Sequence, residues 1–104
     1  MGSSRLERSR PVFTSTHRSV RLAELAGANL FIVHVTCGLA ADEIAAGQAR
    51  GVKVSGETCL QYLTNTVDDL ARPDFEGALY VCSPPLREAH NQELLWTALR
   101  RGVL

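Results

Sequence analysis

Two stretches with helical periodicity alternate with two short apolar runs along the first part of this chain. Residues 15–26 and 39–49 carry apolar side chains at helical spacing, and a glycine closely follows each stretch. The runs at residues 29–35 and 52–58 come next in each case, after very short connections. This order of helix, strand, helix and strand predicts right-handed βαβ units around a parallel sheet, and therefore an α/β fold.

The first apolar run contains a single histidine, His34, near its carboxyl end. Leu, Phe, Ile and Val follow one another in this run without alternation, which indicates a strand that is buried on both faces. In α/β proteins, the carboxyl ends of strands carry catalytic and metal-binding side chains, so His34 is a candidate metal ligand. A histidine in an apolar strand is also often a hydrogen-bonded core residue, and the pattern alone leaves both interpretations open.

Glu57 ends the second run in the same way that His34 ends the first. It can act as an acid or base, or as a hydrogen-bond partner for a histidine on the neighbouring strand. An equally good interpretation is a carboxylate that accepts hydrogen bonds from backbone amides or from Thr58. The other histidines, His17 and His90, do not lie at strand ends, and we expect both on the surface.

Ser83 precedes two consecutive prolines, which exclude a helix or a central strand at this point. No G-x-S-x-G turn surrounds Ser83, so the sequence does not indicate a nucleophile. The prolines instead predict a fixed loop that presents the backbone groups of Ser83 to a ligand. Such groups suit a cyclic amide because they offer both a donor and an acceptor.

The remaining segments are less regular. The polar residues 1–14 predict a disordered tail before a domain at residues 15–104, and the sequence does not reveal whether the first ten residues are native. Beyond the second strand we expect a helical turn around residues 67–70, an extended run at residues 78–81 and a last helix over residues 87–100.

Composition narrows the class of protein. The 104 residues suffice for one small domain, and 11 basic residues balance 11 acidic ones. This balance argues against a nucleic-acid or anionic-membrane binder. The sequence contains neither a long apolar segment nor a signal-peptide core, so we expect no membrane span. Three scattered cysteines without a C-x-x-C pair predict reduced thiols in a cytoplasmic protein.

Five motifs, in order along the chain, resemble the dihydropyrimidinase and D-hydantoinase family. Together they span nearly everything after about residue 16, and they are LAELAGA (22–28), FIVHVTC (31–37), GETC with QYL (56–63), FEGA with YVCSPPLR (75–87) and QELLW (92–96). One departure is Leu60, which stands where family members commonly have proline.

The resemblance implies a cyclic amidohydrolase on a TIM barrel. The family binds two divalent metals, usually zinc, bridged by a carboxylated lysine. They polarise the ring amide of a hydantoin or dihydropyrimidine such as dihydrouracil and generate the nucleophile that opens it, while an aspartate shuttles the proton. By resemblance His34 is one metal ligand, on the sixth barrel strand, and Ser83 binds the substrate ring through its main chain. Family members commonly form homotetramers.

Several family features do not occur in this sequence, among them the His-x-His pair of the first strand, the carboxylated lysine and the aspartate of the eighth strand. The chain therefore maps to a partial TIM barrel with about two βα units, strands six and seven with their flanking helices. Because a catalytic metal needs three or more protein ligands, we expect the chain to be inactive alone. The alternative is a non-catalytic interaction or oligomerisation module derived from the barrel. The preferred cyclic amide cannot be read from these residues.

Overall fold

The computed structural model describes residues 5–104, so the first four residues of the predicted tail lie outside the described part. The elements, in chain order, are α1 (Arg5–Ala26), β1 (Leu30–Ile32), α2 (Gly38–Ala49), β2 (Val54–Gly56), α3 (Leu60–Thr64), the 3₁₀ helices η1 (Val67–Ala71) and η2 (Glu76–Tyr80), and α4 (His90–Arg100). Within residues 5–104, no helix combines the length and apolar character that a membrane span requires.

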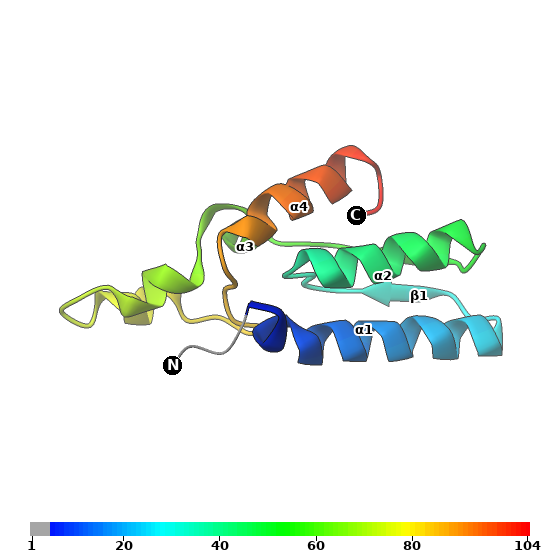
Figure 1. The fold of residues 1–104 in the computed structure, drawn as a ribbon, viewed down its shortest axis with the longest axis horizontal. Coiled ribbons are helices and arrows are strands. Elements are labelled where there is room, and N and C mark those ends of the chain that lie inside the picture. Colours follow the sequence, from blue (N-terminus) through cyan, green and yellow to red (C-terminus); the bar gives the residue numbers. More distant parts are fainter. Residues whose placement is uncertain (1–4) are drawn as a thin grey trace.

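β1 and β2 form a two-stranded parallel sheet, which confirms the predicted βαβ order and the α/β class. In the observed register Phe31 lies opposite Ser55, and Ile32 lies opposite Gly56. Both strands have three residues, fewer than the runs that predicted them. α2 connects the two strands, and it packs against α1 along the sheet (Figure 1).

Only one face of this sheet is covered, so the prediction of a strand buried on both faces is wrong. The central residues of the two strands, Phe31 and Ser55, are both exposed, and Phe31 retains 57% of its surface. Their neighbours on the opposite face, Val54 and Gly56, are buried beneath the helices. The continuous apolar run at residues 29–35 suits burial on both faces of the sheet. Within residues 5–104, however, no element covers the face that carries Phe31 and Ser55.

The core lies where α1, α2 and α4 meet. Each helix contributes a large side chain that is 0% exposed, namely Val20, Ile44 and Leu95 respectively. The approach of α1 to α2 is close at Gly47, where an added Cβ would lie 2.7 Å from Cγ1 of Val20. A glycine at this position therefore lets the two helices pack in contact.

α1 begins far earlier than the expected start near residue 15, and residues 5–14 are helical and continuous with the rest of it. The structure thus has a helix over these residues, where the sequence predicts a disordered tail. Pro11 lies inside the helix, where it removes a backbone hydrogen bond and disfavours helix by about 3 kcal/mol. Packing offsets this penalty, since Ser9 is buried and Val12 packs against the core. The Thr16 hydroxyl donates to the Val12 carbonyl within the helix (2.9 Å).

The chain between α3 and α4 extends away from the helices as an arm, residues 65–85 (Figure 1). η1 supplies the helical turn that the sequence predicts there. A capping box starts it: Thr66 N–H donates to Asp69 Oδ2 (2.9 Å), and the Thr66 hydroxyl accepts from Asp68 N–H (3.3 Å). Bonds from outside the arm add to this, since Val67 N–H donates to the Arg87 carbonyl (2.9 Å) and Gln92 Nε2 donates to the Asn65 carbonyl (3.3 Å).

The second half of the arm contradicts the sequence-based expectation. Residues 78–81 were expected to be extended, yet η2 covers the first three of them. Gly77 is buried against η1, and a Cβ at this position would overlap the Leu70 carbonyl. The close packing of η2 on η1 sets the local conformation here, and the β propensity of the run does not.

The first residue of α2 donates a hydrogen bond to a residue distant in sequence. Its N-cap residue, Cys37, provides no side-chain cap, and Asn91 of α4 instead accepts from the Gly38 N–H through Oδ1 (3.0 Å). Asn91 is 3% exposed, so this bond is shielded from water. It fastens α4 to the segment that follows His34.

We expect Asn91→Ala to lower the free energy of unfolding by about 1–3 kcal/mol, because the buried Gly38 N–H loses its acceptor. Urea unfolding followed by circular dichroism measures the change. Asn91→Asp is the matched control, since it keeps an acceptor oxygen and places negative charge at a helix N-terminus, and it should lose much less stability. Equal losses in the two variants would contradict this role.

Candidate metal centre

Hydrogen bonds keep the two chain segments side by side after the strands end. Glu57 N–H donates to the Ile32 carbonyl (2.9 Å), and Val35 N–H donates to the Glu57 carbonyl (2.7 Å). The Thr58 hydroxyl then donates to the Val35 carbonyl (2.6 Å). The positions of residues 32–35 and 57–58 are therefore fixed relative to one another at the carboxyl edge of the sheet.

His34 interrupts this pairing with a left-handed backbone conformation, φ 56°. The apolar run suggested that His34 lies inside the strand. In the structure it lies two residues beyond the end of β1. Non-glycine residues in this region carry a local penalty of about 1–3 kcal/mol and concentrate at functional sites. The His34 side chain remains 46% exposed, which removes the alternative of a buried core histidine.

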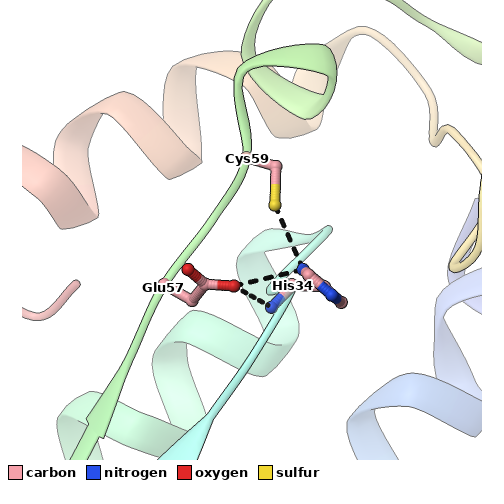
Figure 2. A group of neighbouring side chains, drawn as sticks. All are labelled: His34, Glu57 and Cys59. Carbon is pink, nitrogen blue, oxygen red and sulfur yellow. Dashed lines mark hydrogen bonds and ion pairs between the residues drawn. The ribbon is translucent and has the colours of Figure 1, made fainter.

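Glu57 and Cys59 both face the His34 ring (Figure 2). The ring Nδ1 lies 3.1 Å from Glu57 Oε1 and 3.1 Å from Cys59 Sγ. The same carboxylate oxygen accepts from the His34 backbone N–H at 3.3 Å. Glu57 therefore contacts both a histidine of the neighbouring segment and a backbone amide, the two kinds of partner that the sequence suggests.

Cys59 is a site residue that the sequence interpretation missed. The sequence predicts it only as one of three reduced thiols, and Cys37, Cys59 and Cys82 are all free in the structure. Burial and the charge of Glu57 raise the pKa of the Cys59 thiol above its ordinary value. The available signal was the spacing of residues 57 and 59, because positions two apart in an extended segment point to the same side.

These three side chains have the chemistry of a transition-metal site. Their ligand atoms all lie within 4.8 Å of one another and comprise a nitrogen, a carboxylate oxygen and a sulfur. Zinc binds all three of these atom types. These three donors therefore fit zinc, which is the metal that the family resemblance implies. The resemblance itself assigns only His34 among them as a metal ligand.

A cavity of about 320 Å³ opens beside His34. α1 forms one wall through Val12 and Thr16, and Pro84 of the arm lines it as well. Ser83 is exposed and directly precedes Pro84, so the loop predicted to bind substrate reaches the edge of the space beside the candidate ligand. Ser83 itself is not among the residues that line this cavity.

Tyr62 holds the loop that carries Ser83. Its hydroxyl donates to the Pro84 carbonyl (2.8 Å), and the ring is 4% exposed. Burial, together with the nearby Cys82, raises the pKa of Tyr62 to about 12. An unfolded tyrosine ionises near pH 10, about two units lower.

The unfolded chain therefore releases a proton at alkaline pH that folded Tyr62 retains. Its contribution to stability is complete below about pH 10 and is lost as the pH rises towards about 12. We expect Tyr62→Phe to reduce the loss of stability across this window. Urea unfolding at pH 9, 10 and 11 compares the two proteins, and parallel pH profiles would show that Tyr62 is not responsible.

The other two histidines lie away from this cluster. His90 is exposed at the first residue of α4, as predicted. His17 is 44% exposed, and its Nδ1 also lies 2.6 Å from Glu43 Oε2 of α2, so it faces the neighbouring helix as well as solvent. The amphipathic pattern of α1 alone did not predict this contact, since it depends on how α1 and α2 pack.

The comparisons with known proteins give a consistent result. D-hydantoinase of Rhizobium radiobacter is 54% identical over 90 residues, which cover 86% of this chain and 20% of that protein. Allantoinase of Enterococcus faecalis is 38% identical, over 89% of this chain and 20% of its own length. The crystal structure of dihydropyrimidinase from Brevibacillus agri superposes with a TM-score of 0.86 at 50% identity, over 88% of this chain and 20% of that one. No protein-family model matches the chain.

The parallel α/β arrangement, together with relatives that are D-hydantoinases, allantoinases and a dihydropyrimidinase, defines the class as that of the cyclic amidohydrolases. Within this class, the chain belongs to the dihydropyrimidinase and D-hydantoinase family. It spans about one fifth of the length of the relatives that it matches.

Proposed function

We propose that this chain is the part of a cyclic amidohydrolase barrel that supplies strands six and seven, with His34 as a metal ligand and Ser83 as a substrate-binding residue. The observation that carries the proposal is the placement of His34 at the carboxyl edge of the sheet, half-exposed and beside the cavity that Pro84 also lines. The substrate class is a cyclic amide such as a hydantoin or dihydrouracil, and the expected compartment is the cytoplasm.

The residues of this chain have separate tasks in that reaction. Two zinc ions, when bound, polarise the ring carbonyl and provide a nucleophile at neutral pH. His34 contributes one ligand, and its contact with Glu57 limits the rotation of the imidazole. The backbone N–H of Ser83 would donate to the ring amide, and its carbonyl would accept from it. Tyr62 restrains this loop through its hydrogen bond to the Pro84 carbonyl.

A hybrid enzyme tests the proposal. The 90 matched residues of this chain replace their counterparts in the D-hydantoinase of Rhizobium radiobacter. We expect the zinc-loaded hybrid to open the hydantoin ring, whereas the isolated chain with zinc and either hydantoin or dihydrouracil does not. A folded, zinc-loaded hybrid without activity contradicts the proposal, and ring opening by the isolated chain contradicts the need for the remaining barrel.

A second function, an interaction module that binds barrel subunits of its own family, is favoured by the open sheet face. Phe31, the central residue of β1, remains 57% exposed on this face. The homotetramers expected of the family make such mixed assembly feasible. Size-exclusion chromatography with light scattering, with and without the full-length relative, tests it: a monomer that does not join the relative excludes this function.

A further inference from the structure

We propose that His34, Glu57 and Cys59 form a mononuclear site that binds one divalent transition-metal ion, such as Zn²⁺, within this chain alone. This site is distinct from the two-metal centre of the complete barrel, whose other ligands come from other strands. The two proposals share His34 and are otherwise independent, because metal binding by the isolated chain requires no hydrolysis.

The separations of the donor atoms are close to those around a tetrahedral zinc ion. With metal–ligand distances of about 2.0–2.3 Å, the donors of such a site lie about 3.3–3.6 Å apart. His34 Nδ1 already lies 3.1 Å from both Glu57 Oε1 and Cys59 Sγ, and no pair of the three exceeds 4.8 Å. Small side-chain rotations therefore suffice for coordination.

The backbone holds these donors in place before a metal arrives. The Val35 N–H to Glu57 carbonyl bond joins the two segments directly beside the cluster. Glu57 Oε1 also accepts from the His34 backbone N–H, which turns the carboxylate towards the ring (Figure 2). A site whose donor atoms are already in position loses less conformational entropy when the metal ion binds.

Charge and donor type determine which metal fits. A carboxylate and a thiolate together carry two negative charges, which balance a divalent cation once Cys59 has released its proton to the solvent. Thiolate and imidazole favour Zn²⁺ or Co²⁺, whereas Mg²⁺ and Ca²⁺ prefer oxygen ligands. Because His34 and Glu57 are 46% and 41% exposed, a water molecule can take the fourth position.

Titration of the full chain with Co²⁺ tests the site, since cobalt bound to a thiolate gives a charge-transfer band in the near ultraviolet. We expect one equivalent to bind, with tetrahedral visible bands, and Zn²⁺ to displace it. Cys59→Ser should abolish the charge-transfer band. His34→Ala and Glu57→Gln should each weaken binding by more than about tenfold, because loss of even an outer-sphere partner has an effect of this size.

Matched controls lie outside the cluster. Three substitutions remove the same chemical groups elsewhere in the chain, namely Cys82→Ser, His90→Ala and Glu93→Gln. Each should leave the charge-transfer band and the affinity for Co²⁺ unchanged. Circular dichroism verifies that every variant is folded. No cobalt–thiolate band in the wild-type chain, or a band that survives Cys59→Ser, overturns the proposal. Failure of the hybrid enzyme to open hydantoin, with metal binding by the chain intact, rejects the proposed hydrolase role alone.

Discussion

Replacing His34 with alanine in the hybrid enzyme is expected to slow hydantoin ring opening by more than about 100-fold. Loss of a residue that only orients a metal ligand typically reduces metal affinity or activity 10- to 100-fold, and loss of the ligand itself should exceed this. His34 has a left-handed backbone conformation and lines the cavity, which is where the proposal places the metal. Initial rates at saturating hydantoin, with zinc content measured on the same samples, provide the test.

The matched control is His90→Ala in the same hybrid. His90 is an exposed histidine at the start of α4, outside the cluster, and its removal should leave both the rate and the zinc content unchanged. A His34 variant that retains full zinc and at least one tenth of the rate would show that His34 is not a metal ligand. A parallel loss in both variants would indicate damage to the fold.

The sequence predicted the βαβ order correctly because helical periodicity and glycine stops are local signals. The parallel pairing of β1 and β2 and the turn at η1 followed from these patterns. The start of α1 was not predictable in this way, since Pro11 argues locally against helix and only the burial of Ser9 and Val12 favours it. Contacts between segments distant in sequence determined the outcome there.

The candidate site was predictable in part for the same reason. His34 was identified because it closes an apolar run, and Glu57 because it closes the next one. The contacts of His34 with Glu57 and Cys59 depend on the left-handed conformation of His34 and on the register of two segments that are 23 residues apart. Neither property can be derived from residue types, so the cluster became evident only in three dimensions.

The site also depends on the core directly beneath it. Gly56 ends β2 one residue before Glu57, and a Cβ added there would lie 2.8 Å from Cδ1 of Ile44. Ile44 of α2 thus packs against the backbone that carries Glu57. Its side chain is fully buried, with 0% exposure. The packing of α2 therefore supports the backbone position from which the Glu57 carboxylate extends.

Ile44→Ala should consequently lower the free energy of unfolding by about 2–5 kcal/mol, through lost burial and the cavity left behind. Domains of this size are stable by only about 5–15 kcal/mol, so the variant loses a large part of its stability. Urea unfolding monitored by circular dichroism measures this loss. Ile44→Val, which removes one methylene group, should lose only about 0.5–1.5 kcal/mol.

Leu25→Ala is the matched surface control, since Leu25 lies on α1 with 86% of its surface exposed. Its effect on the free energy of unfolding should stay within about 0.5 kcal/mol, because folding buries little of the Leu25 side chain. Equal losses for Ile44→Ala and Leu25→Ala would contradict the packing described here. A large loss for Ile44→Ala alone, with weaker Co²⁺ binding in the residual folded protein, would confirm that the core positions Glu57.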